Sequence, residues 1–452
     1  MTALFALHSA YGFATAAAAI DDGLLGDDGD RLLVPVVSAR VPETVTGIGA
    51  DPTLASLRAR FDRVEDLNAL LGARHPSSWE PDDDDLPLLE RLLTRAWGLD
   101  PDRLELFVQS PQVAPARTLM SLFPRAPITI IGDGLMTYSP MRVALPYTVS
   151  GRITRVVHAD IVPGVRPLVG GPAATTVPVS AKSLRRALQE TDPGDPVRDA
   201  AGTEVGGSPS TVLVLGQYLA ALGLVSPREE AALQRELVDR AARWSPERIV
   251  FKPHPSAPPV LADAVRDRAP AHGAEFVEYR GPLAAELLAE RLDARAVVAS
   301  FSTALPTVQA LTGTPIGAAG TASLLHRLRP FENSNRVPLT VVDALTREDP
   351  AADALDLQLL VDAVGYAMQP EIAAHLRPRA ERLLGGMDAA ERDRYFDSGR
   401  LTALRLPGAV TPGPVRRLLE PAGGVGRIEE WRLTAAGARR RAGRAWRAIR
   451  GR

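Results

Sequence analysis

Short apolar runs that end in polar residues and lead into helical patterns recur along this chain, and they constrain its fold most. In the amino-terminal half they cover residues 3–8, 31–37, 104–109 and 128–131. In the carboxyl-terminal half they cover residues 211–216, 249–252, 274–279, 296–300 and 315–319. Strands that alternate with helices form mainly parallel sheets with helices on both faces. The sequence therefore predicts an α/β protein of two Rossmann-like, doubly wound domains.

The stretch between the two series has a different composition. Pro, Gly, Thr and Ser are frequent from about Asp160 to Ser210, and only residues 181–189 show a helical pattern. That composition is typical of a linker or a domain edge. A chain of 452 residues, 45% of them hydrophobic, is long enough for two such cores. We expect an amino-terminal domain over 1–160, a linker over 161–210, a carboxyl-terminal domain over 211–385 and further helices over 386–452.

Composition excludes several classes of function. The formal net charge of −2 argues against a nucleic-acid binder, which is usually strongly basic. The chain has no cysteine, so disulfides, thiolate catalysis and cysteine-ligated metals are excluded. Its histidines are scattered and no HExxH or DxD pattern stands out, so we expect no metal and no cofactor. The apolar residues 1–20 lack Lys and Arg, and we expect a strand and a helix there rather than a secretion signal.

The last residues of the chain form a basic segment with an apolar side. Eight arginines between Arg432 and Arg452 alternate with Trp431, Leu433, Trp446 and Ile449, and no acid follows Glu430. A short basic amphipathic helix of this kind suits an anionic membrane surface, and a solvated tail is the alternative. No apolar run is long enough to span a bilayer. We expect a cytoplasmic protein held peripherally at the inner face of the plasma membrane.

Two polar groups follow strands of the second domain. His254 stands between Pro253 and Pro255, which stiffen the backbone just after a strand that ends at Lys252. An imidazole held there can donate to a phosphate oxygen as negative charge grows on a leaving group. Further along, a strand end is followed by hydroxyl residues at the start of a helix, namely Ser300, Ser302 and Thr303. Hydroxyls and free amides at a helix start bind anions, although ordinary helix capping uses the same residues.

A third group follows a strand of the first domain. Asp133 lies between Gly132 and Gly134, immediately after the run 128–131. Its carboxylate could serve as a general base, and an Asp-Gly turn is the structural alternative. Ligands bind at the carboxyl edges of such sheets. Further candidates for the cleft at these edges, for which turn or capping roles are the alternative, are His8, Ser9, Tyr11, Gly12 and Gln217.

Together the three groups resemble the motifs of bacterial sialyltransferases, including the capsule polysialyltransferases. Those enzymes have a GT-B fold, in which two Rossmann-like domains face each other across a cleft. They carry an acidic-acidic-Gly motif, then a His-Pro motif, then a Ser-rich motif. This chain has Gly132-Asp133-Gly134, His254-Pro255 and Ser300-Phe301-Ser302-Thr303 in that order. The first acid of the family motif is Gly132 here, which affects acceptor placement more than the base.

The resemblance implies the roles of these residues. Asp133 would be the general base, and His254 would contact the phosphate of a cytidine monophosphate (CMP) sugar. Lys252, Pro255, Gln217, Ser300, Ser302 and Thr303 would bind the donor. His8, Ser9, Tyr11, Gly132 and Gly134 would line the acceptor side of the cleft. The implied activity is inverting, metal-independent transfer of sialic acid, or a related ulosonic acid, from a CMP donor to a cell-surface glycan.

Two other functions fit parts of the pattern. Teichoic-acid-type transferases, which use CDP-glycerol or CDP-ribitol, share the His-Pro and Ser-rich motifs. Their Ser motif typically reads Asp-Tyr-Ser-Ser, whereas Ala299-Ser300-Phe301-Ser302 has no acid. The second alternative is a non-catalytic scaffold of GT-B shape, which Gly132 favours. Retention of Asp133 and His254 argues against that scaffold.

Overall fold

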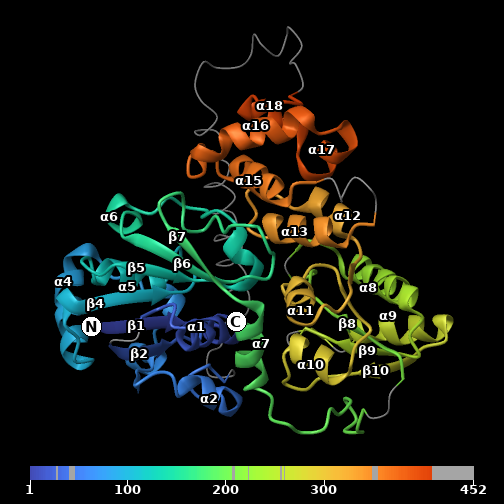
Figure 1. Cartoon of the computed structure of the whole chain (residues 1–452), viewed down its shortest axis with the longest axis horizontal. Coiled ribbons are helices and arrows are strands. Elements are labelled where there is room, and N and C mark those ends of the chain that lie inside the picture. The colour runs from blue at the N-terminus through green and yellow to red at the C-terminus, as the bar shows by residue number, and fades with distance from the viewer. Residues whose placement is uncertain are drawn as a thin grey trace, which may run out of the picture.

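The computed structural model describes residues 1–26, 29–39, 46–205, 209–221, 223–254, 257–258, 260–348 and 355–409. Two separate parallel sheets form its centre, one in each half of the chain (Figure 1). This arrangement confirms the predicted α/β fold of the GT-B type.

The first sheet has seven strands in the order β3-β2-β1-β4-β5-β6-β7. They are β1 (Thr2–Leu7), β2 (Asp30–Pro35), β3 (Arg63–Val64), β4 (Leu104–Val108), β5 (Ile128–Ile131), β6 (Ile153–Ala159) and β7 (Thr175–Val179). Its helices are α1 (Ala10–Asp21), α2 (Ala55–Arg58), α3 (Leu67–Leu71), α4 (Leu86–Ala96), α5 (Ala116–Leu122), α6 (Tyr147–Ser150) and α7 (Ala181–Gln189). All strand pairs are parallel, so the carboxyl ends of β1, β4 and β5 lie side by side.

The second sheet has five strands in the order β10-β9-β8-β11-β12. They are β8 (Thr211–Leu215), β9 (Arg248–Lys252), β10 (Glu275–Glu278), β11 (Ala296–Ala299) and β12 (Ile316–Ala318). The helices that accompany them are α8 (Pro227–Ala241), α9 (Val260–Arg268), α10 (Ala285–Arg291), α11 (Ala304–Thr312) and α12 (Thr321–Arg327). The strands β8, β4 and β11 are entirely buried, because helices cover both faces of each sheet.

Helix α1 packs closely because its side chains are small. Alanines occupy positions 16–19 and are all buried, and Phe13 beside them is also fully buried. The helix contacts α7 along its length, and both helices belong to an apolar cluster that includes residues of both sheets. The two domains therefore share a continuous apolar core at their junction rather than meeting only through solvent.

The range 161–210 holds more regular structure than its composition predicts. Helix α7 has the bounds of the helical pattern predicted at 181–189, but strand β7 also lies in this range, so the first sheet extends beyond residue 160. Strand β7 forms the edge of the sheet, and Pro178 occupies an edge position where a missing N–H costs least.

The helices after the second sheet return to the first domain, at the top of Figure 1. They are α13 (Arg336–Thr346), α15 (Leu357–Met368), α16 (Arg377–Gly386), α17 (Ala389–Tyr395) and α18 (Ser398–Leu404). The Arg166 amide donates to Gln358 Oε1 on α15 at 2.5 Å, and Ser139 Oγ donates to the Ser334 carbonyl at 3.1 Å. These contacts hold the two domains together on the side opposite to the segment between α7 and β8, where the chain passes from the first domain to the second (Figure 1).

The basic segment that is expected to bind a membrane surface, residues 431–452, lies outside the described residues. Among the helices of the described ranges, none combines the length and the apolarity that crossing a membrane requires.

Candidate active site at the domain junction

Asp133 follows β5 and is held by residues from the ends of the two neighbouring strands. Ser9, which caps α1 just after β1, donates from Oγ to Asp133 Oδ1 at 2.9 Å. The same Oγ accepts from the Gln109 side-chain amide and from the Gly12 amide, each at 3.0 Å. Asp133 Oδ2 has no hydrogen-bond partner within the part of the chain that is described. One carboxylate oxygen is thus fixed and the other can meet a substrate hydroxyl.

Gln109, which directly follows β4, holds this network in place through its side-chain amide. Its side chain is 1% exposed, and its Oε1 accepts from the His8 amide at 2.8 Å and from the Ser9 amide at 3.2 Å. Sequence reasoning missed Gln109, although a polar residue ending an otherwise apolar strand was the available indication. The His8 ring points elsewhere, with Nε2 2.9 Å from Ser110 Oγ.

The two glycines beside Asp133 are there for different steric reasons. A Cβ on Gly132 would lie 2.8 Å from Thr137 Oγ1 and 3.1 Å from His158 Cβ. An acidic side chain at position 132 therefore has no room in this packing, which explains the departure from the expected acidic-acidic-Gly pattern. Gly134 has a φ of +55°, in the left-handed region that favours glycine.

The Asp133 turn meets the hydroxyl cluster of the other domain. A Cβ on Gly134 would lie 2.3 Å from Thr303 Cγ2, and the Leu135 amide donates to Thr303 Oγ1 at 3.3 Å. Two of the three predicted groups, far apart in the sequence, are therefore in contact across the domain junction. Tyr11 makes a second link, with its hydroxyl 3.4 Å from Thr307 Oγ1.

The side chains of the hydroxyl cluster differ in their hydrogen bonds and in their exposure. Ser302 Oγ accepts from the Ala304 amide at 3.2 Å at the start of α11, while Ser300 is 2% exposed. Gln217, which follows β8, accepts the Phe301 amide on Oε1 at 2.8 Å. Gln217 thus fixes the turn that carries the cluster. Because Ser302 and Thr303 are only half-buried, their hydroxyls remain open to a ligand.

His254 lies at the end of β9, on the far side of β8 from the hydroxyl cluster. The two groups do not follow adjacent strands, because β8 lies between β9 and β11. The His254 side chain is exposed, yet partial burial lowers its pKa, and the carboxylate of Glu230 acts in the opposite direction. The buried Glu230 accepts the Leu219 amide at 2.6 Å and the Ala220 amide at 3.1 Å, and so anchors the loop after β8. Pro255 lies outside the described residues.

Lys252 contacts the segment that follows β10. Its Nζ donates to the Gly281 carbonyl at 3.1 Å and lies 5.0 Å from the centre of the Tyr279 ring. Burial lowers the pKa of Lys252, opposed by Glu286, while burial raises the pKa of Glu286, opposed by Lys252. Each of these half-buried groups therefore favours the charged form of the other.

A cavity of 420 Å³ separates the first turn of α1 from the second domain. It is lined by Tyr11 on one side and by Glu286, Ser302 and Thr303 on the other. Burial raises the pKa of Tyr11, so its hydroxyl stays protonated and can donate. Glu286 was missed by sequence reasoning because it lies inside an ordinary helical pattern with no motif around it.

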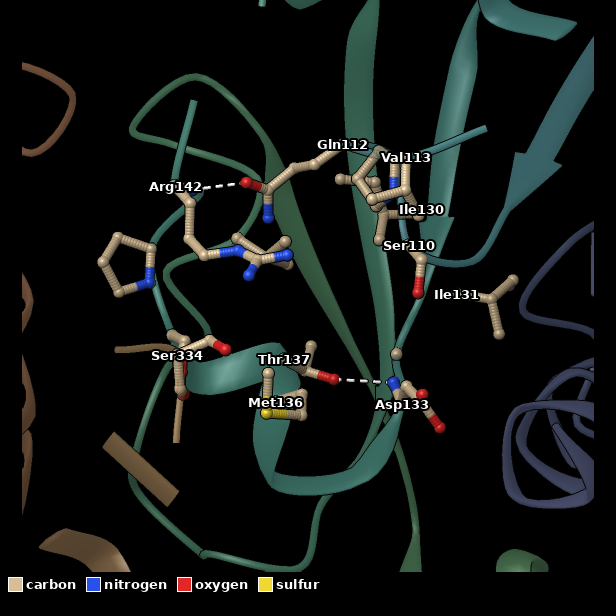
Figure 2. A pocket seen from close by; sticks show the side chains of 15 residues that line it. Ser110, Gln112, Val113, Ile130, Ile131, Asp133, Met136, Thr137, Arg142 and Ser334 are labelled. Carbon is tan, nitrogen blue, oxygen red and sulfur yellow. Dashed lines mark hydrogen bonds between the residues drawn. The ribbon is translucent and has the colours of Figure 1, made fainter. Parts of the chain in front are cut away.

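A second cavity, of 170 Å³, lies beside Asp133 (Figure 2). Residues from the ends of β4 and β5, the turn Gly134–Tyr138 and Ser334 of the second half line it. The Asp133 amide donates to Thr137 Oγ1 at 2.8 Å, which fixes the turn. Thr303 belongs to the lining of the first cavity and Asp133 to that of the second, so the contact between the Asp133 turn and Thr303 borders both cavities.

Comparison with known proteins identifies the family of this chain. The family model named alpha-2,8-polysialyltransferase (POLYST) matches residues 3–316, which include nearly all of both sheets. The chain belongs to this family. A polysialyltransferase-family chain with two parallel α/β sheets is a glycosyltransferase.

Solved structures with a similar course include UDP-N-acetylglucosamine 2-epimerase from Neisseria meningitidis bound to UDP-GlcNAc, at 11% identity and a TM-score of 0.41, covering 83% of this chain and 100% of that one. A glycosyltransferase from Rickettsia africae has 10% identity and a TM-score of 0.36, covering 87% and 98%. The E. coli heptosyltransferase WaaC with ADP-2-deoxy-2-fluoro heptose has 14% identity and a TM-score of 0.33, covering 70% and 88%. No curated protein matches the chain.

Within the described ranges, no group of three or more His, Asp or Glu side chains is placed to hold a metal ion. The polar groups that this polysialyltransferase-family chain brings together at the domain junction are a carboxylate and several hydroxyls, and the His254 imidazole follows β9 in the second domain. Such groups suit proton transfer and phosphate binding.

Proposed function

We propose that the protein transfers sialic acid, or a related ulosonic acid, from a CMP-activated donor to a glycan acceptor, with inversion and without a metal. The contact between the Asp133 turn and Thr303 carries this proposal. It brings a carboxylate with an available oxygen next to hydroxyls that suit a phosphate, at the junction of the two domains. A direct displacement needs a base on one side and a stabilised leaving group on the other.

On the acceptor side, Asp133 acts as the general base. Ser9, whose hydroxyl accepts from Gln109, donates to Oδ1, so Oδ2 is left to accept the proton of the attacking hydroxyl. The hydroxyl oxygen then forms a bond to the anomeric carbon of the donor as the bond to the phosphate oxygen breaks. Because a single displacement occurs, the configuration at that carbon inverts.

On the donor side, hydroxyls and an imidazole receive the departing CMP. Ser302 and Thr303 at the start of α11 donate from their hydroxyls to phosphate oxygens. His254 donates a proton or a hydrogen bond to the leaving phosphate after the domains close around the donor. The Glu286 carboxyl group in the same cavity can hydrogen-bond the ribose hydroxyls of the nucleotide.

Calorimetric titration tests the donor. We expect CMP to bind the wild-type protein more tightly than uridine or guanosine monophosphate, with no added metal. His254→Ala should weaken CMP binding by about 10- to 100-fold, the range for losing a hydrogen bond to a charged group. His375→Ala is the matched control, because His375 is exposed in the helices above the junction. If the wild type binds no cytidine nucleotide, the proposed function is wrong.

Gly12→Ala tests how the base is positioned. A Cβ at position 12 would lie 1.7 Å from Gln109 Nε2, so the Gln109 amide must leave its place between His8, Ser9 and Asp133. We expect the turnover rate with saturating donor to fall by about tenfold or more, because misplaced catalytic groups lose rate steeply. CMP affinity should not change.

Initial rates of sugar transfer and CMP titrations measure this effect. The control is Gly385→Ala on α16, where a Cβ meets no atom within 4 Å. A Gly12→Ala enzyme with wild-type turnover would show that the Gln109 network does not position Asp133.

A further inference from the structure

The lining of the cavity beside Asp133 includes a cation, Arg142, whose backbone is held by a hydrogen bond. Arg142 belongs to the loop that closes the cavity, and its backbone amide donates to the Gln112 side chain (Figure 2). Gln112 Oε1 also accepts the Val143 amide at 3.3 Å. The backbone that carries Arg142 is therefore tied to the segment after β4, which forms the opposite wall of the same cavity.

The Arg142 guanidinium is free to bind a ligand. In the described ranges it makes no hydrogen bond or ion pair of its own, and its side chain is exposed. Arg152 shows the usual structural role for comparison, since its guanidinium donates to the carbonyls of Phe123, Ala126 and Met120. Arg142 has no such structural task, and Figure 2 shows its guanidinium reaching into the cavity.

The rest of the lining fits a sugar with one negative charge. Of the 15 residues that line the cavity, only Asp133 and Arg142 are charged. The others provide hydroxyls, among them Ser110 and Thr137, or apolar surface, among them Met136. In Figure 2 Arg142 and Asp133 approach from opposite sides. A ring between them can present a carboxylate to one and a hydroxyl toward the other.

We propose that Arg142 binds the carboxylate of the terminal acceptor sugar and so makes the enzyme select anionic acceptors. A planar guanidinium can pair with a carboxylate through two parallel hydrogen bonds, which fixes orientation as well as charge. The bound carboxylate positions the sugar so that its reacting hydroxyl faces the domain junction near Asp133 Oδ2. Arg142 is thus a specificity-determining residue. This inference rests on the proposed function, and it names the acceptor class of that same site.

Direct binding of an acceptor tests the inference without requiring transfer. The probes are a short oligomer of α2,8-linked sialic acid and the same oligomer with its carboxylates reduced to alcohols. Both are titrated into the full-length wild type, Arg142→Gln, Arg142→Lys and the control Arg295→Gln. Arg295 is also exposed, but it lies at the amino end of β11, whereas the candidate site lies at the carboxyl ends of the strands. CMP is titrated into each protein in parallel, as a measure of folding and of the donor site.

We expect Arg142→Gln to weaken binding of the acidic oligomer by about tenfold, the lower end for a charged hydrogen bond because the guanidinium is exposed. The affinity of Arg142→Lys for the acidic oligomer should lie between those of the wild type and Arg142→Gln, because lysine keeps the charge but cannot form two parallel hydrogen bonds. The reduced oligomer should bind wild type and Arg142→Gln equally weakly. Arg295→Gln should match the wild type with every probe.

The outcomes separate this inference from the proposed function. If the wild type binds both oligomers alike, or neither, or if Arg142→Gln binds the acidic oligomer as well as the wild type does, the inference is overturned. Normal CMP binding in the same experiment would leave the proposed donor chemistry standing. Arg142-dependent binding of the acidic oligomer without any CMP binding would instead overturn the donor and keep the anionic acceptor site.

Discussion

Asp133→Asn should reduce the rate of sugar transfer by about 10²- to 10⁴-fold, the range for removing a general base. The amide keeps the shape of the side chain and can still accept from Ser9 Oγ, so the fold of the turn should persist. It cannot take a proton from the acceptor hydroxyl. CMP affinity should stay within about twofold of the wild-type value, because the donor groups lie in the other domain.

Steady-state rates with a CMP-sialic acid donor, together with CMP titration, measure this effect. Asp83→Asn is the matched control, since Asp83 is exposed in the short turn before α4. An Asp133→Asn enzyme that keeps a third or more of the wild-type turnover would remove Asp133 from the role of base. The proposed donor site would then need another acceptor base.

Asp343→Asn should lower the free energy of unfolding by about 3 kcal/mol, the lower end for breaking a buried ion pair. Asp343 lies fully buried on α13, and its carboxylate accepts from Arg394 Nε and Nη2 at 2.6 Å each. Thr321 Oγ1 and the Tyr395 hydroxyl also donate to it, at 2.5 and 2.8 Å. In the variant, these donors would surround a neutral amide in place of the carboxylate, although the Arg394 side chain can partly turn to solvent.

Urea denaturation followed by circular dichroism measures the loss, and hydrogen exchange should show it first in α17. The surface pair of Arg377 and Glu381 on α16 is the control, with side chains 42% and 44% exposed. Glu381→Gln should cost less than about 1 kcal/mol, as exposed pairs usually do. Equal losses in the two variants would mean that the Asp343 cluster does not hold the carboxyl-terminal helices in place.

The sequence predicted the strands whose residues are continuously apolar, because such runs belong to sheet interiors in α/β folds. Strand β5, from Ile128 to Ile131, was predicted with its observed bounds. Strands β3, β6 and β7 were missed. Strand β3 has two residues, and β6 and β7 carry polar residues where one side faces solvent. Local patterns identify continuously apolar strands, whereas short strands and strands with polar residues depend on neighbours that only the fold supplies.

The candidate site was predicted in part for the same reason. Asp133 and Thr303 stood out because glycines and hydroxyls mark strand ends, and the structure brings their turns into contact. The contact of Ser9 with Asp133, and the support of Gln109, connect three separate strand ends and leave no trace in local sequence. Lys252 was selected by proximity to His254, but its Nζ donates to the Gly281 carbonyl, a partner 29 residues away that local sequence does not indicate.

The return of α15 to the first domain has a practical meaning for anyone who divides this chain into fragments. Gly365 of that helix approaches Leu168 so closely that a Cβ there would lie 2.4 Å from a Leu168 methyl carbon. A fragment that ends after the second sheet would keep every strand yet strip this cover from the first domain. The amino-terminal half is completed by residues from the far end of the described chain, so neither half is a natural unit for expression.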